Sequence, residues 1–266
     1  MKEEANFEAL MQKALNPENP SKAREKYFDM LYKLYIKSNK NENNWSTFRI
    51  KLREKFANKL DENQKIKYGL TRKSLSKSYF ELKNLSKVKR GYFPIELFYA
   101  TSLSLINKIL KKNAKILEIG YGDFPTFIKL LNKKGYDSYG IDPFAKEFDK
   151  IRTFKCKVKN LPKEITNLKF GCILANMVYS VNYANYFSKN FKWELENKQE
   201  MLKNFSKLLE DKGFLILIDD IGSIFTKEDL KKYFKLILFE KDIEITNFDK
   251  NKFEDFVKIT LLQKKE

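Results

Sequence analysis

The chain contains no histidine and little cysteine, glycine, proline or tryptophan: 2 Cys, 9 Gly, 6 Pro and 2 Trp in 266 residues. Without histidine, a Cys/His zinc site and a histidine general base are both excluded, so acid–base chemistry falls to Asp, Glu, Lys, Tyr or Cys. Scarce glycine and proline argue against a fibrous or linker-rich chain. Cys156 and Cys172 lie in short apolar runs, which predicts a buried, reduced pair of thiols.

Long apolar runs are missing too. No stretch approaches the roughly 20 apolar residues that cross a bilayer, and residues 1–6 are acidic and lack the apolar region of a signal peptide. We therefore expect a soluble, cytoplasmic protein without a membrane partner. With 42% hydrophobic residues, the chain can bury the core of one large domain or of two modest ones.

The formal net charge of +18 is unevenly distributed. Residues 1–112 hold 25 Lys and Arg against 12 Asp and Glu, whereas residues 113–266 hold 28 against 23. Such an asymmetry suits a polyanionic partner or an acidic substrate. A surface coated with lysine for no functional reason explains it as well, since the second part is also rich in lysine.

Residues 1–92 are predicted to form a helical, basic domain that serves as a substrate domain or lid. Apolar residues recur at helical spacing, as in Phe7, Leu10, Met11 and Leu15, and the polar segment 38–44 breaks the pattern. The most basic stretch, residues 65–90, has nine Lys and Arg against one acidic residue and is interleaved with aromatics. It is either a phosphate- and base-binding surface or a solvated amphipathic helix.

Residues 93–266 alternate between strand-like and helix-like segments. Strands are expected near residues 115–119, 137–141, 153–158, 170–175, 214–219, 236–244 and 256–263. Helices are expected near residues 95–111, 125–134, 193–210 and 226–235. A run of βα units predicts an α/β fold with a doubly wound, mostly parallel sheet, and the loop-like link 246–251 suits a final antiparallel hairpin.

A Gly-x-Gly turn directly after the first strand marks a candidate cofactor site. Gly120 permits a sharp turn, and Gly122 lets the backbone approach a ligand closely. Asp142 follows Gly120 by 22 residues, at the end of the second apolar run, where a carboxylate can bond the hydroxyls of a ribose. This order is typical of a nucleotide-binding βαβ unit.

The charges around this turn favour a positively charged cofactor. Pro125 stands where the dinucleotide fingerprint has its third glycine. Glu118, Asp123 and Asp142 place three carboxylates around one crevice, which would repel a diphosphate and attract a cation. S-adenosylmethionine joins a ribose to a sulfonium and an ammonium group, so it is the expected cofactor. Asp123 has an alternative role as the N-cap of the following helix.

These segments resemble class I S-adenosylmethionine-dependent methyltransferases. Residues 116–122 look like the first motif of that family, residues 139–143 like its second-strand motif, residues 170–176 like its fourth strand and residues 208–217 like its fifth. The resemblance covers about residues 93–266. It implies a Rossmann-like methyltransferase fold, with a seven-stranded sheet whose last strand is antiparallel, next to the N-terminal all-helical domain.

The resemblance also implies cofactor contacts, residue by residue. The residues expected at the methionine end are Glu118, Gly120, Tyr121 and Gly122. The remaining expected contacts are Asp142 at the ribose, Pro143 and Phe144 at the adenine, and Ala175 and Asn176 at the floor near the methyl group. Several of them have structural alternatives: Asp142 as a turn residue, Phe144 as core, Asn176 as a strand-end cap and Glu118 as a brace for the loop.

The sequence singles out no catalytic residue. A sulfonium is a strong electrophile, so alignment of donor and acceptor supplies much of the rate, and no nucleophilic triad is needed. Candidates to contact an acceptor are Tyr92, Tyr179, Tyr183, Asp219 and Asp220. Residues 176–179 have the spacing of the Asn-Pro-Pro-Tyr signature of amino methyltransferases but lack both prolines.

Four functions are compatible with these patterns. We favour a methyltransferase acting on a small molecule. The alternatives are a nucleic-acid methyltransferase that uses the basic N-terminal surface, an aminopropyl or aminobutyryl transferase similar to nicotianamine synthase, and a binding module with a degenerate cofactor domain. No metal is expected, and the oligomeric state is not indicated.

Overall fold

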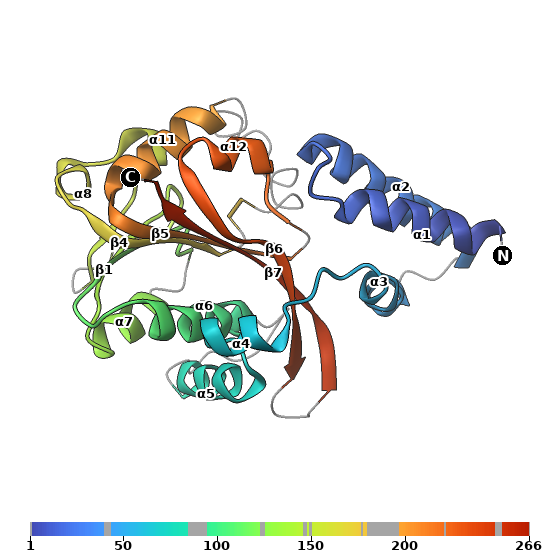
Figure 1. Cartoon of the computed structure of the whole chain (residues 1–266), viewed down its shortest axis with the longest axis horizontal. Coiled ribbons are helices and arrows are strands. Elements are labelled where there is room, and N and C mark those ends of the chain that lie inside the picture. Colours follow the sequence, from blue (N-terminus) through green and yellow to red (C-terminus); the bar gives the residue numbers. More distant parts are fainter. Residues whose placement is uncertain are drawn as a thin grey trace.

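A computed structural model gives the fold of this chain (Figure 1). It describes residues 2–39, 44–84, 95–122, 126–145, 148, 151–176, 178–179, 197–220, 222–247 and 252–265. A seven-stranded sheet carries helices on both faces, and three N-terminal helices lie to one side of it, next to its last two strands.

The sheet has the order β3-β2-β1-β4-β5-β7-β6. Its strands are β1 (Lys115–Ile119), β2 (Asp137–Ile141), β3 (Thr153–Phe154), β4 (Phe170–Asn176), β5 (Leu209–Asp219), β6 (Phe234–Asn247) and β7 (Lys252–Lys264). Strands β1 to β5 are mutually parallel where they pair, and β7 runs antiparallel to both β5 and β6. The predicted doubly wound sheet with an antiparallel seventh strand is confirmed.

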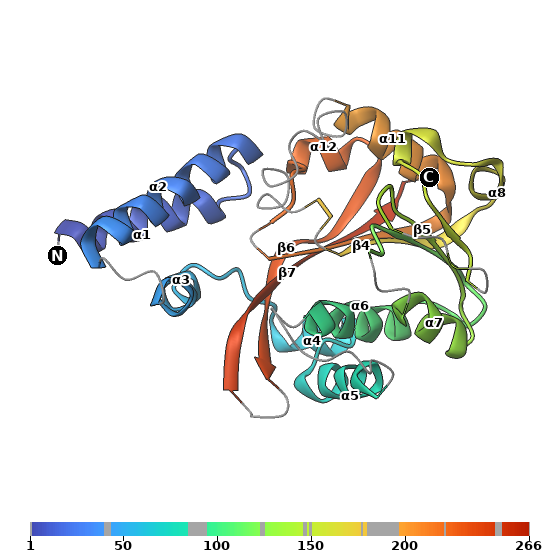
Figure 2. The ribbon, with the colours of Figure 1, turned by 180° about the vertical axis from the view of Figure 1, so that it is seen from behind.

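Two layers of helices sandwich this sheet (Figure 2). One layer holds α4 (Glu62–Tyr68), α5 (Arg72–Lys83), α6 (Ile95–Ile109) and α7 (Thr126–Lys133). The other holds the 3-10 turn Val158–Asn160, α8 (Lys163–Thr166), α11 (Lys198–Leu208) and α12 (Lys227–Lys231). Alternate residues of each strand enter opposite cores: Ile116 and Ile216 face the α6 layer, whereas Leu117 and Leu215 face the α11 layer.

The N-terminal helices divide into two groups. Helices α1 (Lys2–Leu15), α2 (Ser21–Asn39) and α3 (Trp45–Glu54) share a core of their own, whereas α4 and α5 pack into the core of the sheet. Leu75 and Leu82 form the buried stripe of α5 and belong to the same cluster as Leu103 of α6. The hydrophobic core therefore continues across the expected domain boundary at residue 92, which itself lies outside the described residues.

Several elements differ from the sequence-based expectation. Strand β3 has only two residues and ends at Phe154, and a 3-10 helix begins at Val158, within the range expected to be strand. Helix α12 is half as long as expected. Helix α4 was not predicted, although its signals are present: Asp61 and Gln64 form a capping box, and Gly69 ends the helix at φ +68°. Neither cysteine forms a disulfide, as expected, but only Cys172 is fully buried.

The positive charge lies away from the N-terminal arm formed by α1–α3. Residues 55–112 hold 14 Lys and Arg against 4 Asp and Glu. The described part of the basic stretch 65–90 forms α4 and α5, which cover the α6 side of the sheet. In the described part of the chain, no helix is long and apolar enough to cross a membrane.

Candidate cofactor site

The ends of β1, β2 and β4 bring the predicted site residues together. Glu118 stands opposite Gly140 and Leu174 in the parallel register, so Asp142 and Asn176 follow at the same edge. Ligands of open α/β sheets bind at this carboxyl edge. Asp123 lies outside the described residues, and so do Tyr92 and Tyr183.

The turn after β1 requires its two glycines for different reasons. Gly120 has φ +72°, its N–H donates to the Ile141 carbonyl at 2.8 Å, and an added Cβ would lie 2.3 Å from Cγ2 of Val178. Gly122 has φ +57°, but an added Cβ would meet no atom within 4 Å. Gly120 therefore has no room for a side chain, whereas Gly122 faces open space where a ligand can approach the backbone.

Asp142 organises the two loops at this edge. Its Oδ2 accepts a hydrogen bond from the Gly122 N–H at 3.0 Å, and its Oδ1 accepts from the N–H groups of Phe144 at 2.7 Å and Ala145 at 2.9 Å. The turn role considered for Asp142 is thus present. A carboxylate offers about four lone-pair sites, so these three bonds leave one for a ligand hydroxyl.

Glu118 is a buried acid with unmet hydrogen-bonding capacity. It is 1% exposed, and within the described residues neither carboxylate oxygen has a hydrogen-bond partner of normal geometry. Burial raises its pKa to about 8; the nearby Tyr99 and Asn176 lower it, and the like charge of Asp142 raises it. Asn176 accepts a hydrogen bond from Ser102 Oγ at 2.6 Å, while its Nδ2 has no partner in the described part.

This arrangement suits the charge expected of the cofactor. Both Glu118 oxygens, without a hydrogen bond of normal geometry in the described part, and the fourth lone-pair site of Asp142 lie under an open glycine turn. Burial favours the protonated form of Glu118 in the free protein, and a positively charged donor group would favour its carboxylate, because charge-assisted hydrogen bonds offset the burial of that charge. Among the described residues, no group of three or more Cys, Asp or Glu is placed to hold a metal ion.

Four other predicted contacts differ in how far their side chains are exposed. The Tyr121 ring is fully buried with Ile128 and Ala145, so only its backbone is left to face a ligand. Phe144 is 56% exposed, so the core role considered for it is wrong, and its ring is free to lie against a base. Ala175 points into the α11-side core, so only its backbone is left to form the expected floor of the cofactor site. Pro143 is half-buried.

The end of β5 and the segment after it lie beside β4. Tyr179 is buried against Phe205 and Phe225, and its carbonyl accepts the Ile224 N–H at 2.8 Å. Asp219 and Asp220, at the end of β5, are 2% and 8% exposed. Of the described acceptor candidates, Tyr179 is therefore committed to packing, whereas the two acids stand at the carboxyl edge.

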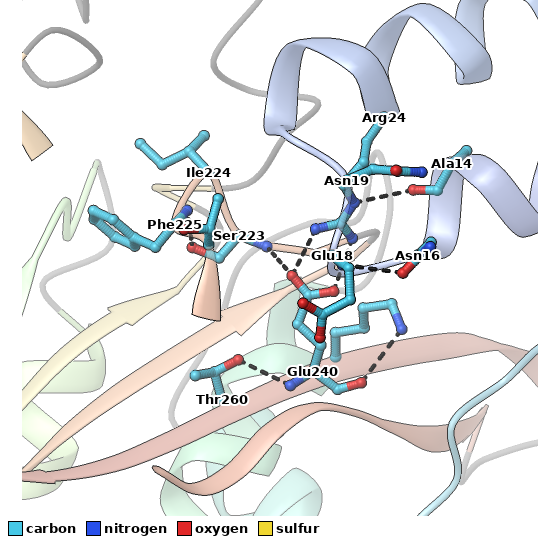
Figure 3. Close-up of polar contacts among 12 residues, drawn as sticks. Ala14, Asn16, Glu18, Asn19, Arg24, Ser223, Ile224, Phe225, Glu240 and Thr260 are labelled. Atoms are coloured by element: carbon cyan, nitrogen blue, oxygen red, sulfur yellow. Dashed lines mark hydrogen bonds and ion pairs between the residues drawn. The ribbon is translucent and has the colours of Figure 1, made fainter. Parts of the chain in front are cut away.

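A buried ionic junction that the sequence did not predict joins the N-terminal arm to this edge (Figure 3). Arg24 of α2 binds both carboxylate oxygens of Glu240 at 2.8 Å, and its Nε donates to the Ala14 carbonyl at 3.1 Å. Glu240 also accepts the Ser223 N–H at 3.1 Å, which fixes the segment after β5. The pair is separated by 216 residues, so local sequence patterns carry no signal for it.

The burial of Glu118 predicts a specific pH dependence of stability. Its pKa is 4.5 in the unfolded chain and about 8 when folded, so the folded state holds the proton over that interval and stability falls as pH rises from 4.5 to 8. In Glu118→Gln, the free energy of unfolding should no longer fall by about 1.4 kcal/mol per pH unit within this window. Urea unfolding at pH 5 to 8 measures it, and the exposed Glu62→Gln is the control. Parallel curves for wild type and Glu118→Gln would contradict the expectation.

The solved structures similar to this chain are distant from it in sequence. No protein-family model matches the chain, and no curated protein matches it. Among solved structures, the chain is similar to the N-methyltransferase NodS from Bradyrhizobium japonicum in complex with S-adenosyl-L-homocysteine, with 13% identity and a TM-score of 0.46 over 71% of this chain and 99% of NodS. It is also similar to TrmN from Thermus thermophilus, with 16% identity and a TM-score of 0.44 over 71% of this chain and 53%, about half, of TrmN.

A third similar structure is a SAM-dependent methyltransferase from Methanosarcina mazei, with 14% identity and a TM-score of 0.40 over 66% of this chain and 99% of that one. Similarity at this level carries no functional argument. The observed strand order, with β7 antiparallel between β5 and β6, is itself decisive for the architecture. The fold is the Rossmann-like methyltransferase fold.

Proposed function

We propose that this protein is an S-adenosylmethionine-dependent methyltransferase that acts on a small-molecule acceptor. The observation that carries the proposal is the buried Glu118, whose two oxygens lie near the polar groups of Tyr99 and Asn176 but make no hydrogen bond of normal geometry in the described part, beneath a glycine turn that leaves open space at Gly122. A cationic nucleoside fits this combination, because the acid needs a positive donor and the turn admits a ligand against its backbone.

The chain offers a complementary group to each part of this cofactor. Glu118 would hold the positively charged methionine end, and the remaining lone pair of Asp142 would accept from a ribose hydroxyl. The exposed ring of Phe144 would cover the adenine. When bound, the cofactor supplies a methyl group on an electrophilic sulfonium, so the protein's task is to align an acceptor and exclude water.

A small acceptor is favoured over a nucleic acid by the distribution of charge. The described basic residues of the stretch 65–90 lie on α4 and α5, on the α6 side of the sheet. The carboxyl edge instead gathers four acids, namely Glu118, Asp142, Asp219 and Asp220. This edge therefore offers an acceptor acidic side chains, whereas the cations of the basic stretch that suit phosphates lie on α4 and α5.

Calorimetry on Asp142 variants tests the proposal. Asp142→Ala should weaken S-adenosylmethionine binding by roughly 1–3 kcal/mol, the scale of hydrogen bonds lost to a charged group. Asp142→Asn keeps an acceptor for the Phe144 and Ala145 N–H groups, so it separates loss of the ribose contact from loss of the turn. Asp211→Ala is the control, because that acid is 91% exposed at the opposite end of β5. Unchanged affinity in Asp142→Ala would reject the ribose role.

The product distinguishes methyl transfer from transfer of the aminopropyl or aminobutyryl arm. Methyl transfer releases S-adenosylhomocysteine, whereas arm transfer releases methylthioadenosine. We expect the first product, because Glu118 would hold the methionine arm in place.

A further inference from the structure

Helix α6 brings two polar side chains to the underside of the cofactor site. Glu118 follows Ile116 by two residues in β1, and Ile116 packs in the α6-side core, so Glu118 faces the same layer. Asn176, at the end of β4, faces this layer too, because its amide contacts α6. Tyr99 and Ser102 of α6 are buried here, at 6% and 0% exposure.

The Ser102 hydroxyl fixes which end of the Asn176 amide it meets. Ser102 Oγ donates to Asn176 Oδ1 at 2.6 Å, whereas the Phe98 carbonyl, one turn earlier in α6, lies 3.2 Å from the same hydroxyl. A hydroxyl has a single proton to donate, and 2.6 Å is typical of an O–H···O bond and shorter than a usual N–H···O bond. Ser102 therefore binds the oxygen of the amide, and the NH2 group is directed away from it.

That NH2 group lies beside Glu118. Asn176 Nδ2 and both Glu118 oxygens are buried without a hydrogen bond of normal geometry in the described part. Burial raises the pKa of Glu118 to about 8, and the neighbouring Tyr99 and Asn176 lower it, as donors to a carboxylate do. The amide is thus a donor that favours the ionised form of Glu118.

We propose that Ser102 is a positioning residue of the cofactor site, whose hydroxyl holds the Asn176 amide with its NH2 group toward the carboxylate of Glu118. This inference rests on the proposed function, in which that carboxylate receives the positive end of the cofactor. Without the hydroxyl, the amide is free to turn over and present its oxygen to Glu118. Two oxygens that only accept hydrogen bonds repel each other, so the carboxylate would lose its support.

The charges around Glu118 determine how this role can be measured. Among the described residues, the titratable groups that act on it are Tyr99 from α6 and Asp142 from the loop after β2. Burial raises the pKa of Tyr99 well above its usual value, so this phenol stays a neutral donor. Asp142 adds a like charge, which opposes ionisation. Removal of the amide as a donor should therefore raise the pKa of Glu118 further.

Urea unfolding of paired variants from pH 5 to 10 tests the inference without any cofactor. Wild type and Ser102→Ala are each compared with the same protein carrying Glu118→Gln, and the difference in free energy of unfolding isolates Glu118 from other groups. In wild type this difference should fall as pH rises and become constant above about pH 8. In Ser102→Ala it should keep falling for roughly one pH unit more, because the folded state holds the proton longer.

Two further variants separate positioning from packing. Ser104→Ala is the matched control, since Ser104 is also buried in α6 but donates to the Gly69 carbonyl. It should leave the limit near pH 8 unchanged. Asn176→Ala should raise this limit as Ser102→Ala does, and the two changes together should raise it no further. An unmoved limit in Ser102→Ala, or a larger rise in the double variant, would overturn the inference.

Calorimetry with S-adenosylmethionine distinguishes a failure of this inference from a failure of the proposed function. Below pH 8 the cofactor must displace the Glu118 proton, so Ser102→Ala should bind it roughly tenfold more weakly at pH 7 and as wild type does well above the raised limit. Equal affinity at pH 7, or the same loss at every pH, would contradict the positioning role. If wild type binds no S-adenosylmethionine at any pH, the proposed function fails, and the unfolding comparison still decides the role of Ser102.

Discussion

Glu240→Ala is expected to destabilise the protein by about 3–5 kcal/mol, because it leaves the guanidinium of Arg24 buried without a counter-charge. Arg24 is 2% exposed, so water cannot replace the lost carboxylate. The Ser223 N–H would also lose its acceptor, which loosens the segment after β5. The free energy of unfolding from urea titration measures the effect.

Two controls separate the buried charge from other effects. The double variant Arg24→Met with Glu240→Leu removes both charges together. It should lower the free energy of unfolding far less than Arg24→Ala and Glu240→Ala do in sum. Glu244→Ala, on the same strand, breaks the half-exposed pair with Lys59 and should cost less than about 1 kcal/mol. A double variant as unstable as that sum would show that the charges themselves are not the cause.

Gly122→Ala is expected to abolish most cofactor affinity while leaving the fold largely intact. The added methyl group would meet no protein atom within 4 Å, so its cost to folding is the strain of φ +57°, about 1–2 kcal/mol. The same methyl group would occupy the space through which a ligand approaches the backbone. We expect S-adenosylmethionine binding to weaken by roughly tenfold or more in calorimetry.

Gly120→Ala is the matched variant at the other glycine of the turn, where an added methyl group would meet a protein atom and not open space. Its added Cβ would lie 2.3 Å from Val178 Cγ2, so overpacking of about 1–3 kcal/mol adds to the strain of φ +72°. It should therefore unfold at a lower temperature than Gly122→Ala. The explanation fails if Gly122→Ala binds the cofactor as wild type does, or if the two variants are equally stable.

The sequence predicted those parts of the fold that local patterns determine. Strands β1 and β2 begin and end where expected, because each is a short run bounded by polar or turn-forming residues. The final hairpin followed from its loop-like link, although the turn itself lies outside the described residues. The glycine turn and Asp142 were located by their spacing alone.

What the sequence could not predict depends on contacts distant along the chain. The apolar stripe of α5 resembles that of α1, yet one packs on α6 and the other on α2, since a helical stripe does not identify its partner. The inward direction of the Tyr121 ring depends on the space that Gly140 leaves, where an added Cβ would lie 2.8 Å from that ring. The pairing of Arg24 with Glu240 depends on the same kind of tertiary contact.

A calorimetric titration of the wild-type chain with S-adenosylmethionine, with NAD as the comparison ligand, tests the central claim most directly. The acids under the glycine turn should bind the cationic nucleoside at one site per chain and reject the diphosphate of the dinucleotide. Binding of NAD in preference to S-adenosylmethionine, or binding of neither by the folded protein, would contradict the account.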